Sequence, residues 1–332
     1  MMKKILCIYM MAILLLVGCS SNEQQNLIDN EQNNQSGTNG DANSNIDESG
    51  DGERFGANSY NTQEVADEMR YIEENIKPSE GPKKRILVTG STAGLGELTA
   101  YYLAKRGHTV VAHARNEARA ADVRRDIPEI SDVVIGDLND LDQTRQLAED
   151  INVLGTFDVI IHNAGVYGQP SDEMLNVNSL SPYILTSLVN RPKQLIYLTS
   201  DQHLSGDIDA DDITSDNPRT TYSDTKAHIS ALAMAVAREW PEIQSNAVQP
   251  GWVPTRMGFA NGNTTTPDNL REGYMTQVWL AEATEPGSQV TGEYFFHQEI
   301  DRNFNPIVRD VAAQNRMLDA FAQKTGVSFT RD

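Results

Sequence analysis

The sequence predicts a single domain of the α/β class. Its core is expected to be a Rossmann-like, doubly wound parallel sheet with helices on both faces. Two observations predict it. From about residue 83 onward, short runs rich in β-branched residues alternate with longer runs of helical periodicity. A glycine-rich turn also joins the first of these strands to the first helix, where such folds bind a nucleotide. Ligands in this architecture lie at the carboxyl ends of the strands.

The chain begins with a segment typical of an export signal, residues 1–18. Two lysines precede an apolar run over residues 5–17, which is shorter than a membrane-spanning helix requires. The run ends in Leu-Val-Gly-Cys at residues 16–19 and resembles the lipobox of bacterial lipoproteins. The resemblance implies cleavage before Cys19, a diacylglycerol on its sulfur, and anchoring to the extracytoplasmic side of a membrane in the cell envelope. An ordinary cleaved signal and an uncleaved anchor are the alternatives.

Two segments separate this leader from the main domain. Residues 19–59 are rich in Asn, Gln, Ser, Gly and acidic side chains, and they hold too few apolar groups to offset the entropy of ordering, so we expect a disordered tether. Residues 60–82 are expected to form a short amphipathic helix and a linker, because apolar side chains recur at spacings of four, three and four before a proline. These residues are Val65, Met69, Ile72, Ile76 and Pro78.

The composition excludes several classes of function. The 332 residues with 39% apolar side chains can bury a full core. A net charge of −20 argues against nucleic-acid binding, which needs patches of Lys and Arg. Both cysteines, Cys7 and Cys19, fall within the first twenty residues, so the main domain cannot contain a disulfide framework. No cluster of His, Cys, Asp and Glu has the spacing of metal ligands, and no metal is expected.

The main domain is expected over residues 83–332. Its first strand covers residues 85–89 and its first helix ends at Lys105, because a β-branched run leads through the glycine turn into a helical pattern. Further strands are expected at residues 109–113, 132–135, 157–161, 194–199, 245–248 and 294–296. Further helices are expected at residues 117–126, 140–151, 172–188, 222–240 and 269–283, with one more near the C-terminus.

The glycine turn has the spacing Gly-x-x-x-Gly-x-Gly, with Gly90, Gly94 and Gly96. Glycine lets the backbone approach a pyrophosphate, whose negative charge is met by the free N–H groups and the dipole of the following helix. The spacing differs from the commoner Gly-x-Gly-x-x-Gly, and no Lys-Ser/Thr follows the last glycine as in a P-loop. Alone, the pattern is equally compatible with a tight turn.

Tyr222 and Lys226 lie four residues apart in the predicted helix 222–240. Residues at this spacing share a helix face, so the phenol and the ammonium can point into one site. A cation beside a phenol stabilises the phenolate and lowers its pKa toward the working pH, which suits general acid–base catalysis. On its own, such a pair is more often two surface residues that share a face.

Together these motifs resemble the classical short-chain dehydrogenase/reductase family over roughly residues 83–326. The matching motifs follow the family's order and comprise Thr89-Gly90-x-x-x-Gly94-x-Gly96, Asp137-Leu138, Asn163-Ala164-Gly165, Asn178, Ser200, Tyr222-x-x-x-Lys226 and Pro250-Gly251-x-x-x-Thr255. Residues 198–209 are similar to the subgroup of retinol dehydrogenases and related carbonyl reductases. The resemblance implies the Rossmann-like fold and hydride transfer between a nicotinamide cofactor and a small carbonyl or alcohol substrate.

The resemblance also implies catalytic roles for four residues. Tyr222 would exchange a proton with the substrate oxygen, and Lys226 would lower the pKa of Tyr222 and bind the nicotinamide ribose. Ser200 would hold the substrate oxygen, and Asn178 would complete a proton path through a water molecule. The alternatives are that Ser200 bonds only to the local backbone and that Asn178 is a helix-capping or buried amide.

NADP(H) is favoured over NAD(H) because Arg115 follows the second strand. A guanidinium there can form two hydrogen bonds to a 2′-phosphate, whereas an acidic residue would bind the ribose hydroxyls of NAD. Thr92 and Ala93 stand where some relatives have a basic residue, so the preference depends on one arginine, and a solvated surface arginine is the alternative. Asp137 would approach the adenine and Thr255 the carboxamide. The other implied cofactor contacts are Gly90, Ser91, Thr92, Gly94, Leu95, Gly96, Leu138, Asn163, Ala164, Gly165, Tyr222, Lys226, Pro250, Gly251 and Val253.

Three hypotheses about function are open. The first is a membrane-tethered NADP(H)-dependent oxidoreductase, since every catalytic position is filled. The second is a tethered dinucleotide-binding module without physiological turnover, because nicotinamide cofactors are scarce outside the cytoplasm. The third is a cytoplasmic enzyme translated from a later start such as Met69. An alanine-rich face on helix 222–240 would allow packing between subunits, so a homo-oligomer is left open.

Four residues outside the motifs are interpreted without a chemical role. His203 could line the substrate entrance, or it could be a partly exposed structural histidine. The tryptophans Trp240, Trp252 and Trp279 are interpreted as packing residues.

Overall fold

The structure is a computed structural model that describes residues 54–57 and 60–331. The predicted signal peptide, Cys19 and almost all of the predicted tether lie outside the described residues. All described residues belong to one unit of the chain.

The described part of the main domain is built on an eight-stranded sheet in the order β3-β2-β1-β4-β5-β6-β7-β8. Neighbouring strands are parallel except β7 and β8, which pair antiparallel. This confirms the doubly wound α/β fold. The strands are β1 (Arg85–Val88), β2 (Thr109–Ala114), β3 (Asp132–Ile135), β4 (Val159–His162), β5 (Gln194–Leu198), β6 (Gln244–Gln249), β7 (Tyr294–Phe296) and β8 (Glu299–Ile300).

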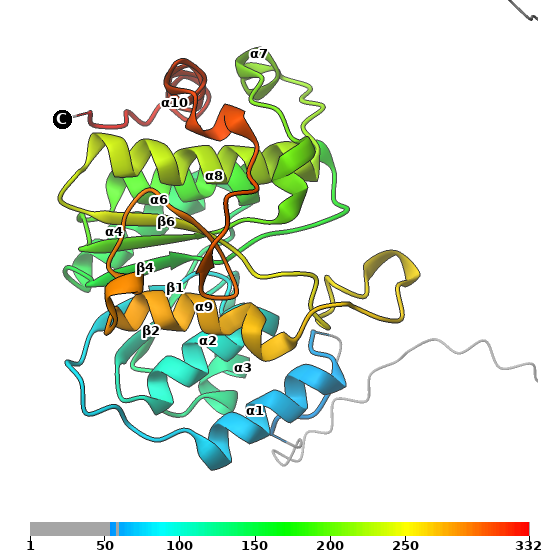
Figure 1. The fold of residues 1–332 in the computed structure, drawn as a ribbon, viewed down its shortest axis with the longest axis vertical. Helices are drawn as coiled ribbons and strands as arrows, with labels where there is room; N and C mark the ends of the chain where they lie inside the picture. The colour runs from blue at the N-terminus through cyan, green and yellow to red at the C-terminus, as the bar shows by residue number, and fades with distance from the viewer. Residues whose placement is uncertain (1–53, 58–59, 332) are drawn as a thin grey trace, which may run out of the picture. The chain divides into compact units, whose positions relative to one another are not determined.

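Helices cover both faces of the sheet (Figure 1). On one face α4, α6, α8 and α10 share an apolar core with the strands, for example through Leu147, Leu232 and Met317. On the other face α1, α2 and α9 do so. The helices are α1 (Gln63–Asn75), α2 (Gly94–Lys105), α3 (Glu117–Asp126), α4 (Leu141–Val153), α5 (Ser171–Leu175), α6 (Ser181–Leu188), α7 (Ala210–Thr214), α8 (Tyr222–Glu239), α9 (Leu270–Glu282) and α10 (Val311–Thr325).

Short turns of other helix types connect these elements. One is a π-helical turn, η1 (Asn176–Leu180), which joins α5 to α6. The expected single helix over residues 172–188 is therefore divided by a turn that inserts an extra residue, a feature often found at functional sites. The 3₁₀ turns are η2 (Asp201–Ser205), η3 (Ala260–Gly262), η4 (Pro286–Ser288) and η5 (Pro306–Arg309).

Helix α1 occupies the position expected for the amphipathic helix. It buries Val65, Met69 and Ile72, while Ile76 forms its C-cap. Glu68 of α1 accepts hydrogen bonds from Arg271 at 2.7 and 2.9 Å and from the Tyr274 hydroxyl at 2.7 Å. These contacts attach α1 to α9.

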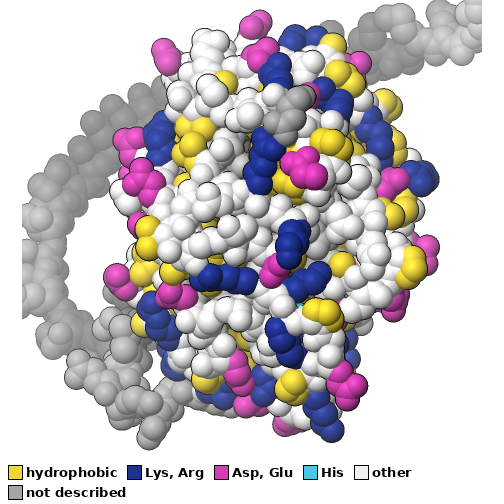
Figure 2. Space-filling model, turned by 90° about the vertical axis from the view of Figure 1, so that its left-hand side faces the viewer, with side chains coloured by type: hydrophobic (Ala, Val, Ile, Leu, Met, Phe, Trp, Pro, Cys, Tyr) yellow, Lys and Arg dark blue, Asp and Glu magenta, His cyan; other side chains and the backbone are white. Residues whose placement is uncertain are grey.

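The surface of the described residues carries mixed charges. On the face in Figure 2, Lys and Arg side chains lie next to Asp and Glu side chains, with apolar side chains scattered between them. Among the described residues, we find no helix with both the length and the apolar character needed to span a bilayer.

Candidate active site

A cavity of about 590 Å³ opens at the carboxyl ends of the parallel strands. Its lining includes all but two of the catalytic and cofactor-binding residues predicted from the sequence. They are Gly90, Thr92, Gly94, Leu95, Gly96, Arg115, Asp137, Leu138, Asn163, Ala164, Gly165, Ser200, Tyr222, Lys226, Pro250, Gly251, Val253 and Thr255. Ser91 and Asn178 are the two that do not line it. Residues far apart in the sequence are thus brought to one place.

The glycine turn lies too close to the end of β4 to accept side chains. Gly90 has a φ of 63°, and a Cβ on it would lie 2.8 Å from the Cα of Ala164. A Cβ on Gly96 would lie 2.3 Å from both the Gly90 carbonyl oxygen and Asn163 Nδ2. Asn163 also donates from Nδ2 to the carbonyls of Thr89 and Gly90, at 3.0 and 3.2 Å. These contacts explain why residues 90 and 96 are glycines, and they place the start of α2 beside the cavity.

His113, near the end of β2, supports the turn, although the sequence reasoning gave it no role. Its Nδ1 accepts a hydrogen bond from the Gly90 N–H at 3.0 Å, and its Nε2 lies 2.9 Å from the Gly136 carbonyl oxygen. Nε2 must therefore carry the proton. Burial lowers the pKa of His113, which favours this neutral form. A polar residue within an apolar strand is the signal that could have indicated it.

Ser91 is part of the same support. Its side chain is fully buried, donates to the Val88 carbonyl at 2.9 Å and accepts from the His113 N–H at 2.8 Å. Both bonds are made to the backbone of neighbouring strands. Ser91 therefore stabilises the turn from behind.

Tyr222, Lys226 and Ser200 meet in the cavity. Tyr222 is the first residue of α8, and Lys226 follows one turn later. Ser200 lies two residues after the end of β5. Lys226 Nζ lies 5.3 Å from the centroid of the Tyr222 ring and donates to the Leu198 carbonyl at 3.1 Å. Ser200 Oγ donates to Asp201 Oδ1 at 3.0 Å. The phenol of Tyr222, the ammonium of Lys226 and the hydroxyl of Ser200 therefore line the same cavity.

Burial sets the protonation of two of these groups. It raises the pKa of the Tyr222 phenol above its usual value; the Asp201 carboxylate raises it further, and the Ser200 hydroxyl opposes the change. Burial also lowers the pKa of Lys226 to about 8. The expected lowering of the Tyr222 pKa by Lys226 is therefore not found here. A phenol with a raised pKa is protonated at neutral pH, the form that can donate a proton.

Asn178 lies behind this group, in the π turn. Its Oδ1 accepts from the Val166 N–H at 2.8 Å, and its Nδ2 donates to the Val166 carbonyl at 2.9 Å and to Thr225 Oγ1 at 3.1 Å. A Cβ on Gly165 would lie 3.4 Å from Asn178 Oδ1 and 3.5 Å from Lys226 Nζ. The side chain of Asn178 is thus a buried amide that braces α8 against the loop after β4.

The cavity extends past the glycine turn to Arg115, which is exposed. In the part of the chain that the structure describes, no carboxylate forms an ion pair with this guanidinium. Tyr60 also lines the cavity, and its ring centroid lies 3.6 Å from the guanidinium carbon of Arg119. Tyr60 precedes the main domain and belongs to no motif, so sequence reasoning missed it.

The loop after β6 closes another side of the cavity. Gly251 has a φ of 82°, and the Trp252 N–H donates to Asp268 Oδ2 at 2.6 Å. Thr255 is buried and accepts from the Gly258 N–H at 3.2 Å. The Trp252 side chain is 48% exposed and lines the cavity, so its interpretation as a packing residue is wrong. Trp240, at 2% exposed, is a packing residue as expected.

His203 is not an entrance residue. It is fully buried, its Nδ1 lies 2.7 Å from the Ser200 carbonyl oxygen, and its Nε2 accepts from the Asn305 N–H at 3.2 Å. The structural interpretation was right, but the expectation of partial exposure was wrong. His203 fixes the backbone of Ser200.

The sequence is similar to known proteins along most of the main domain. The family model described as short chain dehydrogenase matches residues 84–196. An uncharacterised oxidoreductase of Emericella nidulans is 42% identical over 186 residues, which cover 52% of this chain and 72% of that protein. A short-chain dehydrogenase of Gibberella zeae is 36% identical over 259 residues, which cover 73% of this chain and 97% of that protein.

Solved structures share the fold at lower identity. An uncharacterised protein of Mycobacterium paratuberculosis is 20% identical, with a TM-score of 0.63, covering 78% of this chain and 98% of that chain. A short chain dehydrogenase of Escherichia coli in complex with NADPH is 22% identical, with a TM-score of 0.53, covering 68% of this chain and 99% of that chain.

Within the described ranges, no group of three His, Cys, Asp or Glu side chains is arranged to hold a metal ion.

Proposed function

Because the chain belongs to the short-chain dehydrogenase family of oxidoreductases, we propose that it transfers a hydride between NADP(H) and a carbonyl or alcohol substrate, with Tyr222 as the general acid and base. One observation carries the proposal. Tyr222, Lys226 and Ser200 line the same cavity as the glycine turn that opens α2. A cofactor on that turn and a substrate beside Tyr222 would therefore be neighbours.

The residues of the cavity fit a dinucleotide. The turn glycines leave the backbone open to a pyrophosphate, and the N-terminus of α2 favours its negative charge. Arg115 offers a guanidinium to a 2′-phosphate. Asp137 and Asn163 would lie along the adenosine half, and Thr255 near the carboxamide. The cofactor would supply the hydride, and the protein would supply position and a proton.

Proton transfer would fall to three residues. In reduction, the protonated Tyr222 phenol donates its proton to the carbonyl oxygen, and in oxidation it takes the proton back. Lys226, with a pKa of about 8, is largely charged at neutral pH and would stabilise the phenolate. Ser200 Oγ would turn from Asp201 to donate to the same oxygen. Such a positioned acid contributes roughly 10²- to 10⁴-fold in rate.

NADP(H) is the cofactor we propose, with NAD(H) as the second option. Arg115 supports the choice through its charge. Two structural neighbours also support it, since the short chain dehydrogenases of Escherichia coli and Shigella flexneri were solved with NADPH and NADP, respectively.

Titration of the purified full-length protein tests the proposal. We expect NADPH to bind in the micromolar range and to be oxidised by some member of a panel of aldehydes and ketones. Tyr222→Phe should bind NADPH within about twofold of wild type while kcat falls by roughly 10²-fold or more, because only the transferred proton is lost. Tyr71→Phe, an exposed tyrosine on α1, is the matched control and should change neither quantity.

The outcomes separate the two hypotheses. Wild-type turnover by Tyr222→Phe would contradict the role of Tyr222. Tight NADPH binding without turnover of any carbonyl would favour the dinucleotide-binding module. A folded protein that binds neither NADPH nor NADH would refute both hypotheses.

The lipid anchor is a separate proposal, which rests on the motif at residues 16–19. We expect full-length protein to incorporate labelled palmitate in a lipoprotein-processing host and Cys19→Ser to remain unlabelled. Unlabelled wild-type protein would refute the anchor. A start at Met69 is disfavoured by packing, because it would remove Val65 and the first turn of α1.

A further inference from the structure

The segment Tyr60–Thr62, directly before α1, lies across the phosphate end of the cavity. It precedes residues 84–196, the part matched by the family model. Asn61 and Thr62 are each 8% exposed, although they stand outside the predicted main domain. Buried polar side chains normally form hydrogen bonds, so their partners show what the segment does.

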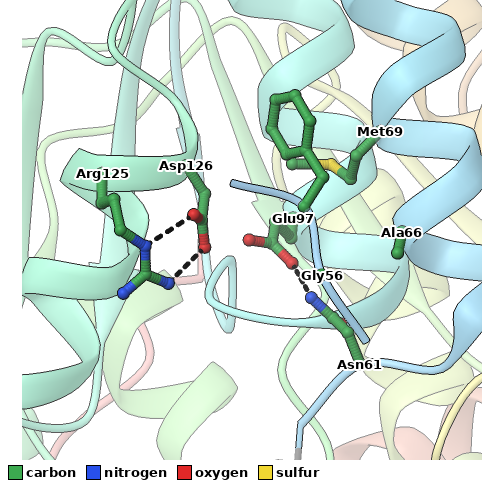
Figure 3. A pocket seen from close by; sticks show the side chains of 8 residues that line it. Gly56, Asn61, Ala66, Met69, Glu97, Arg125 and Asp126 are labelled. Carbon is green, nitrogen blue, oxygen red and sulfur yellow. Dashed lines mark hydrogen bonds and ion pairs between the residues drawn. The ribbon is translucent and has the colours of Figure 1, made fainter. Parts of the chain in front are cut away.

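Asn61 caps α2 from outside the helix. Its Oδ1 accepts from the N–H of Gly94, the first residue of α2, at 3.0 Å. Its Nδ2 donates to Oε2 of Glu97 in the first turn, at 2.7 Å, and Figure 3 shows the Asn61 amide directed at this carboxyl group. Ala93, the residue before the helix, has no side chain that can cap. Asn61 therefore supplies the cap that the local sequence lacks.

The space beside Gly94 is more open than that beside the other two glycines of the motif. The φ of Gly94 is 58°, and a Cβ on this residue would meet nothing nearer than Thr255 Cγ2 at 3.6 Å. Gly90 and Gly96, by contrast, are tightly enclosed. The hydrogen bond from the Gly94 N–H to Asn61 Oδ1 is thus a contact that can fix the middle of the glycine motif.

Tyr60 and Thr62, the sequence neighbours of Asn61, contact other segments that line the cavity. Thr62 Oγ1 donates to the Pro254 carbonyl at 2.9 Å, in the loop after β6. The Tyr60 ring lines the cavity and stacks on Arg119, which donates to the Thr92 carbonyl within the glycine motif. Three consecutive residues thus hold the glycine turn, the start of α3 and the β6 loop.

We propose that Tyr60–Thr62 is a positioning element of the cofactor site, in which Asn61 sets the Gly94 turn and Tyr60 forms part of the wall. The inference rests on the proposed binding of NADP(H). The dinucleotide would bind to a turn whose shape is fixed by a segment outside the domain that carries the motifs. Loss of that segment's contacts should weaken cofactor binding more than it slows the chemical step.

Full-length Asn61→Ala tests this inference. Loss of the bonds to Gly94 and Glu97 should raise the Kd for NADPH roughly tenfold, because the Gly94 N–H would lose its partner and the turn its fixed shape. At saturating NADPH, kcat should stay within about twofold. Asn75→Ala is the matched control, because Asn75 lies at the end of α1 and donates only to the Tyr71 carbonyl among its described bonds. All Kd values are measured well below the midpoint of thermal unfolding, so that lost stability alone cannot change them.

Hydrogen–deuterium exchange of the peptide over residues 90–97 gives a readout that needs no cofactor. We expect faster exchange in Asn61→Ala and unchanged exchange in Asn75→Ala. If wild type binds NADPH and Asn61→Ala binds it equally well, the inference is overturned. If exchange rises in Asn61→Ala but wild type binds no nucleotide, the proposed function fails while the positioning of the turn stands.

A second variant covers the case in which Asn61→Ala does not fold. Tyr60 is 42% exposed, so Tyr60→Ala should fold normally. It should raise the Kd for NADPH several-fold by removing the ring that stacks on Arg119 and lines the cavity. An unchanged Kd for NADPH in Tyr60→Ala would show that Tyr60 is not part of the cofactor site.

Discussion

Arg115 is the single residue with the most direct bearing on the cofactor. It is exposed on the cavity lining, and no carboxylate of the described residues is paired with it. A guanidinium at this position suits a 2′-phosphate, while a carboxylate suits ribose hydroxyls and repels the phosphate. In the proposed NADP(H) site, the sign of this one charge would select between the two nicotinamide cofactors. The position could be read from the sequence because it directly follows a strand.

Arg115→Asp should move the preference from NADPH toward NADH. Hydrogen bonds to charged groups are worth about 1.5–3 kcal/mol, so we expect the ratio of the two Kd values to change by roughly ten- to hundredfold. Arg124→Asp makes the same charge change at an exposed position on α3 and serves as the control. An unchanged ratio in Arg115→Asp would contradict the assignment of Arg115 to the 2′-phosphate.

Among the elements, the contact between η2 and the start of α8 positions Ser200 relative to Tyr222, the two residues proposed to contact the substrate oxygen. Thr221 and Asp224 form a reciprocal capping box at the start of α8, and Asp224 also accepts from the Asp207 N–H at 2.8 Å. Gly206 follows η2 and packs directly on the first turn of α8. Since Ser200 precedes η2 and Tyr222 begins α8, this contact fixes the distance between hydroxyl and phenol.

Gly206→Ala should therefore disturb both stability and turnover. A Cβ would lie 2.1 Å from the Ser223 carbonyl oxygen, and the backbone atoms there cannot yield without moving α8. We expect a loss of about 1–3 kcal/mol in the free energy of unfolding, measured in urea, and a lower kcat. Gly81→Ala, where a Cβ would meet only the flexible Ser79 hydroxyl at 3.3 Å, should be close to neutral. Wild-type stability in Gly206→Ala would show that the contact is not tight.

The elements also show which features a sequence can reveal. Strand and helix order could be predicted because β-branched runs and helical periodicity are local signals. The π turn at Asn178 could not, because it depends on bonds to Val166 and to Thr225, 47 residues away. The raised pKa of Tyr222 could not be predicted for a similar reason: its main cause is burial, which is a property of the folded chain. Asn61 had no local signal, since its partners belong to another helix.

Across the whole molecule, histidine burial links stability to pH. Of the six histidines in the chain, four are buried with lowered pKa values: His113, His162, His203 and His228. Burial lowers the pKa of His162 to about 3 and that of His228 to about 4. An unfolded histidine titrates near 6.5, so the unfolded chain binds protons first as the pH falls. The contribution of these four histidines to stability is therefore complete above pH 6.5 and is lost progressively below it.

His228→Asn should weaken this dependence. Each buried histidine contributes up to about 1.4 kcal/mol per pH unit between its folded and unfolded pKa values. Urea unfolding between pH 6.5 and pH 4 should therefore show a shallower slope in the variant than in wild type. Glu97→Gln is a control with the opposite sign. Burial raises the pKa of Glu97 to about 8, so the contribution of Glu97 to stability is lost as the pH rises from 4.5 to 8, and its removal should not make the slope shallower below pH 6.5. Identical slopes for wild type and His228→Asn below pH 6.5 would contradict the account.

The attachment of α1 dictates an order of assembly during synthesis. Helix α1 can pack on α2 as soon as residue 105 has been made, but the partners of Thr62 and Glu68 lie 192 and 203 residues further along the chain. Contacts across such distances form late, because a long loop must close before they stabilise anything. A nascent chain that stops before Arg271 would therefore carry a glycine motif and an N-terminal helix without their final anchorage. Cofactor-binding competence should appear only after α9 has emerged, near the end of translation.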